Sequence, residues 1–168
     1  MKTSFALYAR LVVALGLALL VTRAPSAETL PVPELALVVV DAVQRQQGAI
    51  TDFDRIDLAF THVAKQRKWP VKIVAEQFTA STAAHDTELR VFNQPLREET
   101  SGDLTFRGWM TLTVGGTKHD FGMITYRYYR RAGEPSEDVF EKVFRGAAQV
   151  AAEKIEPILF SKANAPKA

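Results

Sequence analysis

Three histidines are the side chains of this chain whose type best suits metal binding or proton transfer. His62, His85 and His119 are the only histidines, and no two lie three or four residues apart, the spacing at which one helix presents two metal ligands. Asp120 follows His119, but neighbouring side chains of a strand point to opposite faces, so this acid cannot orient the imidazole. The sequence therefore predicts no catalytic residue, no metal site and no cofactor.

A short acidic segment offers a second grouping suited to acid–base work or to cation binding. Asp52, Asp54 and Asp57 lie close together, and Arg55 neutralises part of their charge. Carboxylates are also favoured at the start of a helix by its dipole, which explains the segment without a site. The chain has no Cys and no G-x-S-x-G motif. An enzyme, of an unrecognised hydrolytic type, is therefore the third of three functional hypotheses.

Residues 104–130 predict a β-hairpin, which positions the most interesting surface. Two runs of alternating polar and apolar residues meet at Gly115 and Gly116, and paired glycines allow the positive φ angles of a tight turn. If Val114 pairs with Thr117, every later pair follows, and the residues of each face are determined.

One face of this hairpin is predicted to carry aromatic rings and guanidinium groups. Its members are Arg107, Trp109, Tyr126 and Tyr128, with Arg130 at the end of the second strand. Aromatic rings stack on sugars and guanidinium groups hold anions, so we expect this face to bind a partner. In the alternative, a helix or a neighbouring segment covers the face, and Trp109 fills the space over Gly122.

The other face of the hairpin supplies a second hypothesis, a carrier of a small apolar ligand. Long apolar side chains of the hairpin and of the last helix would enclose the ligand between sheet and helix. They are Phe106, Met110, Phe121, Met123, Phe140 and Phe144. Because such residues usually form an ordinary core, the carrier is an alternative to the binding protein.

Three further segments have the pattern of strands. Residues 35–43 are continuously apolar and β-branched at their centre, which favours a buried strand, with a short helix as the alternative. Residues 71–79 and 88–96 are the other two. Pro95 indicates that the last of these lies at a sheet edge or ends there.

Two amphipathic helices complete the set of elements. The first spans about residues 51–67, because Thr51 and Asp54 match a capping box and apolar residues recur at spacings of three and four. Ser136 is expected to cap the second helix, and Pro157 to end or kink it.

The predicted fold is an α+β two-layer sandwich. An antiparallel sheet of four to five strands is covered by an N-terminal helix and a long C-terminal helix, in the order β-α-β-β-β-β-α. This single domain spans residues 35–160, after an extended lead-in at residues 27–34 and before a disordered tail at residues 161–168.

The first 26 residues have the pattern of a bacterial signal peptide. Lys2 and Arg10 precede an uncharged run over residues 11–21, and Ala24 and Ser26 are the small residues that a signal peptidase accepts. The run is shorter than the roughly 20 residues of a spanning helix, so we expect cleavage near Ser26 or Ala27 and no stable membrane span afterwards.

Removal of the leader changes the charge of the chain. Three of the 21 basic residues and no acidic residue lie in it, which leaves 18 basic against 19 acidic residues. A nearly neutral, exported chain is not expected to bind nucleic acid. The sequence favours a periplasmic or secreted, non-enzymatic binding or accessory protein of the bacterial envelope. Its partner is an envelope protein, glycan or lipid, bound through the sheet surface or edge, and an exposed edge also allows homo-oligomers.

Overall fold

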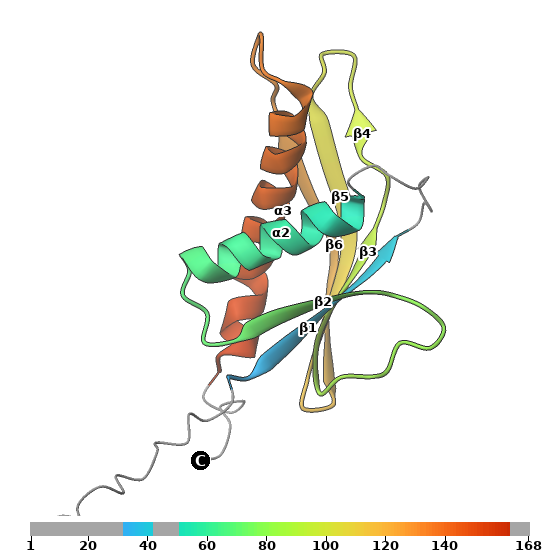
Figure 1. Cartoon of the computed structure of the whole chain (residues 1–168), viewed down its shortest axis with the longest axis vertical. Helices are drawn as coiled ribbons and strands as arrows, with labels where there is room; N and C mark the ends of the chain where they lie inside the picture. Colours follow the sequence, from blue (N-terminus) through green and yellow to red (C-terminus); the bar gives the residue numbers. More distant parts are fainter. Residues whose placement is uncertain (1–31, 42–50, 162–168) are drawn as a thin grey trace, which may run out of the picture. The chain divides into compact units, whose positions relative to one another are not determined.

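The computed structural model describes residues 32–41 and 51–161 (Figure 1). They belong to a compact unit that spans Val32–Ala168. The predicted leader, most of the lead-in and the tail beyond residue 161 lie outside the described residues. The elements are β1 (Glu34–Asp41), α2 (Asp52–Gln66), β2 (Lys72–Gln77), β3 (Thr87–Asn93), β4 (Arg97–Glu98), β5 (Leu104–Val114), β6 (Thr117–Tyr128) and α3 (Ser136–Leu159).

The six strands form one mixed sheet, so the prediction of a strictly antiparallel sheet of four to five strands is wrong. β1 pairs in parallel with β2 on one side and with β3 on the other. β5 pairs antiparallel with β3, with the two-residue β4 and with β6. Helix α2 is the physical reason for the parallel pair, because a crossover returns the chain to the end of the sheet where β1 began.

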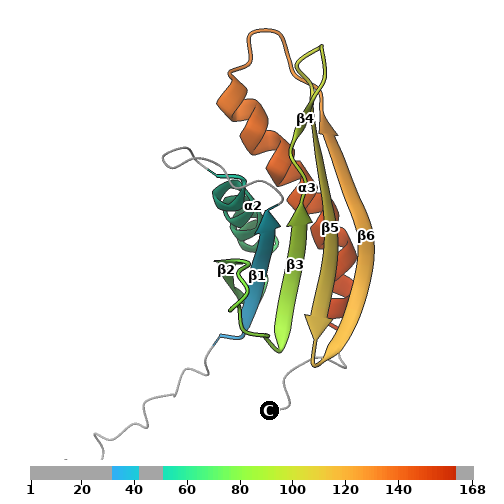
Figure 2. The ribbon, with the colours of Figure 1, turned by 90° about the vertical axis from the view of Figure 1, so that its right-hand side faces the viewer.

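Both helices lie against one face of the sheet, which curls into a half-barrel (Figures 1 and 2). The α+β class and the two covering helices are thus confirmed. Residues 35–43 were expected to form a strand, and β1 confirms this as far as Asp41.

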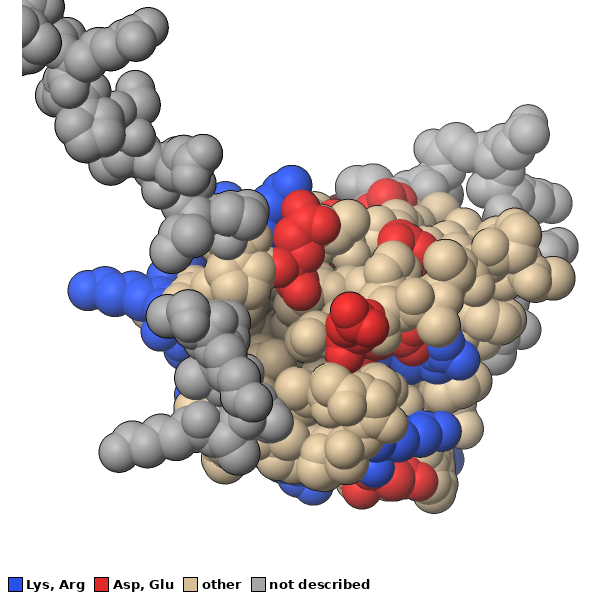
Figure 3. Space-filling view, turned by 90° about the horizontal axis from the view of Figure 1, so that it is seen from below, with Lys and Arg blue, Asp and Glu red and all other residues tan. Residues whose placement is uncertain are grey.

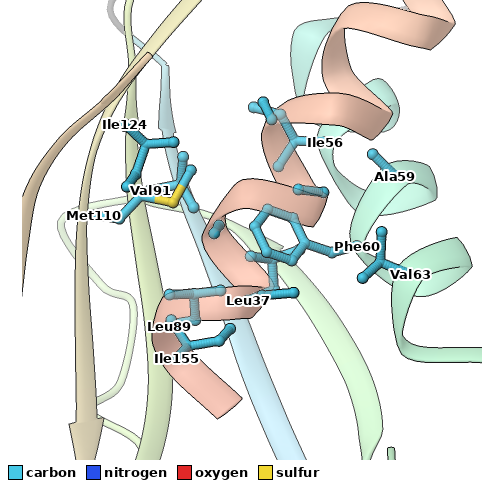
Figure 4. Close-up of a cluster of buried hydrophobic side chains, with 14 of the residues drawn as sticks. Leu37, Ile56, Ala59, Phe60, Val63, Leu89, Val91, Met110, Ile124 and Ile155 are labelled. Atoms are coloured by element: carbon cyan, nitrogen blue, oxygen red, sulfur yellow. The ribbon is translucent and has the colours of Figure 1, made fainter. Parts of the chain in front are cut away.

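The core lies between the helices and this face of the sheet. Apolar side chains of α2 and α3 meet those of β1, β3, β5 and β6 there (Figure 4). Phe106 of β5 packs edge-on against Phe144 of α3, with ring centres 5.6 Å apart. No helix in the described ranges is long and apolar enough to cross a lipid bilayer.

The start of α2 is built as predicted. Thr51 Oγ1 accepts a hydrogen bond from the Asp54 N–H at 3.2 Å, and the Asp54 carboxylate accepts one from the Thr51 N–H at 2.9 Å. The Thr51 hydroxyl also donates to the Asp54 carboxylate at 2.6 Å. This bond first, and then that from the Thr51 N–H, stabilise the ionised carboxylate, so the pKa of Asp54 lies below its usual value. The pair closes the capping box and sets the point at which the helix begins.

The start of α3 differs from the prediction. Pro135 takes the N-cap position, without a side-chain cap, while the Ser136 hydroxyl accepts a hydrogen bond from Arg130 Nη2 at 3.3 Å. The expected Ser136 cap is therefore wrong, because the hydroxyl serves the connection from β6. Pro157 lies within the helix, which ends two residues later at Leu159.

The β5–β6 hairpin has the predicted turn but contains an unpredicted bulge. Val114 pairs with Thr117, as expected, and the pairing continues to Thr111 and Asp120. Met110 then pairs with Gly122, so Phe121 is an extra residue in β6. Because side chains alternate along a strand, one extra residue turns the rest of β6 over.

Candidate binding face

The sheet face that carries no helix is divided into a covered half and an open half. The connection between β2 and β3, residues 78–86, crosses the covered half (Figure 1). His85 of this connection places Nε2 3.0 Å from Glu76 Oε1 on β2. Ala36 and Val38 of β1, which point to this face, are buried.

The covered half contains a small cavity of about 220 Å³ with an acidic lining. Glu34, Glu76 and Asp86 line it together with His85. Acidic side chains also gather on this end of the folded unit when it is viewed from below (Figure 3). Within residues 32–41 and 51–161, no group of three or more His, Asp or Glu side chains is placed to hold a metal ion.

The open half carries a row of apolar side chains that crosses the strands. In the register, Val40 is paired with Phe92, Phe92 with Trp109, and Trp109 with Met123. The Phe78 N–H donates to the Val39 carbonyl at 2.8 Å, which places Phe78 beside Val40. We name these five residues the apolar row: Phe78, Val40, Phe92, Trp109 and Met123.

The apolar row is open to solvent. The exposed fractions of Phe78, Phe92, Trp109 and Met123 lie between 40% and 44%. With roughly 200 Å² for each side chain, the exposed apolar area is about 300 Å², the lower end of the largest apolar patch on a typical monomer. Such patches often belong to binding sites.

Arginines border the apolar row on both sides, and they differ in their partners. Arg90 donates to Glu88 at 2.7 Å, and its guanidinium lies 5.3 Å from the ring centre of Phe78. Arg107 lies on the other border, pairs across the strands with Thr125 and is exposed. Arg107 has no ion-pair partner among the residues that the structure describes. Its charge is therefore available to an incoming group.

The structure separates the predicted binding residues. Arg107 and Trp109 lie on the open face, as expected. Tyr126 pairs with Phe106, and Tyr128 with Leu104, so both tyrosines lie on the face that the helices cover. The expectation that they share a face with Trp109 is wrong, and the bulge in β6 is the reason.

Tyr128 and Arg130 contribute to the connection between β6 and α3. Arg130 donates to the Glu134 carbonyl oxygen at 2.8 Å, and the Tyr128 hydroxyl donates to the Glu134 carboxylate at 2.9 Å. Lys142 and the Arg131 N–H also donate to this carboxylate. These bonds, that of Lys142 foremost, lower the pKa of Glu134 to about 2. Both predicted binding residues thus have structural partners.

The predicted ligand-lining residues do not surround one space. Phe106, Met110 and Phe144 are buried core residues. Phe121 and Phe140 pack against the core and are partly buried. Met123 lies on the opposite face, in the apolar row.

The remaining histidines lie apart from one another. His62 is exposed and lines a groove of about 490 Å³ between α2 and α3. His119 pairs across the hairpin with Leu112 near the turn and is partly buried. The side chain of the neighbouring Asp120 accepts the Gly122 N–H at 2.8 Å, which holds the bulge.

Three members of the open face were not predicted from the sequence: Phe78, Val40 and Phe92. Each belongs to a segment with the alternation of a strand, so the face on which its side chain lies could be predicted from the sequence. Their alignment with Trp109 depends on the register between strands far apart in the sequence, and no turn fixes that register.

The chain is similar to several solved structures. An uncharacterized protein has a TM-score of 0.47 at 10% identity, covering 74% of this chain and 88% of that one. A Xanthomonas campestris protein of the family DUF330 has a TM-score of 0.41 at 14% identity, covering 79% and 88%. Rare lipoprotein B from Shewanella oneidensis has a TM-score of 0.36 at 16% identity, covering 77% and 97%.

No family model matches the chain, and no curated protein matches it in sequence. At identities of 16% or less and TM-scores below 0.5, these similarities carry no functional assignment.

Proposed function

We propose that this protein is an exported, non-enzymatic binding or accessory protein of the bacterial envelope, and that it recognises its partner through the apolar row. The predicted signal peptide supports the location. The observation that carries the binding role is the row itself, in which large apolar side chains remain exposed on the one sheet face that lacks a helix.

The size of the apolar row suits a partner that binds reversibly. Burial of about 300 Å² of apolar surface contributes about 7 kcal/mol before the costs of association are subtracted. These costs amount to several kcal/mol, so the row alone supports a weak complex, and polar contacts at its border must add affinity. Arg107 is placed to make such a contact.

Trp109 is the side chain of the row whose removal is expected to weaken binding most. Large aromatic residues at the centre of an interface typically contribute about 2 kcal/mol or more when truncated to alanine. For Trp109→Ala we therefore expect about a 30-fold loss of affinity for the envelope partner. More than half of Trp109 is buried, so the unfolding temperature of the variant is measured as well, to separate lost binding from lost stability.

A pull-down from envelope extract with the immobilised mature protein measures this loss. Leu58→Ala is the matched control, because Leu58 is 65% exposed on α2, away from the open face. The control should retain the partner as the unaltered protein does. Equal retention by Trp109→Ala and Leu58→Ala would show that the apolar row does not bind.

A further inference from the structure

The direction of the apolar row limits the form of its partner. The row crosses the strands instead of following one of them, from Phe78 beyond β2 to Met123 on β6. Its four inter-strand steps of about 4.8 Å give a length of about 19 Å. On β3, β5 and β6 polar residues border the row, with Arg90 and Thr111 on one side and Arg107 and Thr125 on the other. On β1 the neighbour of Val40 on this face is Val38, which is buried, so the exposed part of the row is one side chain wide.

From this shape we propose that the occupant of the apolar row is an amphipathic α-helix of a partner protein, lying across the strands. The inference rests on the proposed function and names the partner's form. A helix rises 1.5 Å per residue, so about 13 residues cover the row. Its apolar side chains would recur at spacings of three and four residues, which gives a single narrow stripe.

The openness of the face favours a helix over a lipid chain. An acyl chain has no polar side, and on a surface whose own side chains are 40% to 44% exposed it would keep much of its length in water. An amphipathic helix buries its apolar stripe and leaves its polar side in solvent. An extended strand would instead use a sheet edge and run along the strands.

The charges on the two borders indicate how the helix is oriented. Arg90 is neutralised by Glu88 and held by the ring of Phe78, so this border offers little net charge. Arg107, on the other border, is exposed and has no ion-pair partner within the described part of the chain. The partner helix therefore carries at least one acidic residue on the edge that faces Arg107.

Photo-crosslinking from the two ends of the apolar row tests the proposal. p-Benzoylphenylalanine replaces Phe78 in one variant and Met123 in another, in cells of the source organism, and the crosslinked residues are mapped by mass spectrometry. Both positions are more than 40% exposed, so the larger side chain fits without repacking. The same probe at Leu58 measures background.

For a helix across the strands, the two variants crosslink to one segment of one protein. The two attachment sites should lie about 10 to 15 residues apart, whereas an extended segment of the same length would place them about 6 residues apart. The shorter spacing, or an adduct with the mass of a lipid, overturns the helix while leaving the binding face in place. If neither variant forms an adduct above the Leu58 background, the proposed function itself is overturned.

A charge reversal tests the orientation. In the Met123 probe variant, Arg107→Glu should lower the adduct yield at least threefold, because the acidic edge of the helix would face a like charge. Arg131→Glu is the control, since Arg131 is another exposed arginine, on the connection to α3. Equal yields in the two variants would contradict an acidic edge at Arg107.

Discussion

At the scale of single residues, Tyr126 and Gly146 show how closely the sheet and α3 approach. A Cβ atom added to Gly146 would lie 2.1 Å from the Tyr126 ring, far inside van der Waals contact. The ring therefore rests on the backbone of the helix, and only glycine leaves room for it. This contact also explains why Tyr126 is partly buried against the helix and does not belong to the predicted platform on the open face.

We predict that Gly146→Ala destabilises the protein although alanine is the better helix former. Overpacking costs about 1 to 3 kcal/mol, and the gain in helix propensity returns about 1 kcal/mol. In a Tyr126→Ala background the clash is absent, so the same substitution should be neutral or stabilising. Urea denaturation of the four proteins of this double-mutant cycle measures both effects. An equal loss in both backgrounds would show that the ring does not rest on Gly146.

At the scale of elements, patterns within one segment were predictable and relations between segments were not. The capping box at Thr51 and the turn after Val114 are local signals, and both are confirmed. The direction of β2 follows from α2 lying between β1 and β2, because a helical crossover favours parallel strands. The β-α-β order of the sequence was therefore the signal against a fully antiparallel sheet.

The unpredicted bulge in β6 had the larger effect on which residues form the candidate site. Asp120 and Gly122 flank Phe121. A glycine two residues after a short acceptor side chain is typical of a bulge, but the same pattern also occurs at other irregularities of a strand. Without the bulge, alternation carries Tyr126 and Tyr128 to the side of Trp109. With it, Met123 takes that place, and the predicted platform of rings becomes the apolar row.

The bulge predicts a specific sensitivity at Gly122. Its φ of +69° lies in the left-handed region, where a residue with a Cβ atom costs about 1 to 2 kcal/mol. Gly122→Ala should lower the free energy of unfolding by that amount. Gly122→Asn should lower it less, because asparagine enters this region more readily. Chemical denaturation compares the two, and equal losses would argue against strain as the cause.

At the scale of the whole molecule, the two sheet faces have different roles. One carries both helices and the core, while the other is half covered by residues 78–86 and half open. The acidic cavity belongs to the covered half, and Arg107, which has no ion-pair partner among the described residues, borders the open one. The apolar row is thus a separate patch beside a positive charge, which is the arrangement that the proposed partner helix requires.

The proposed export leads to a prediction about how the chain is processed when it carries its leader. When the protein is expressed with its own leader in a bacterium, we expect a periplasmic product whose first residue is Ala27 or Glu28, as determined by intact mass. Its isoelectric point should fall from the basic value of the full chain, about 8.9, because 18 basic and 19 acidic residues remain. Ala24→Leu should block cleavage after Ser26, since a signal peptidase accepts only small residues three positions before the cut, and Ala6→Leu should not. A product that keeps Met1 and stays in the cytoplasm would contradict the proposed envelope location. It would not contradict the proposal that the apolar row is a binding surface.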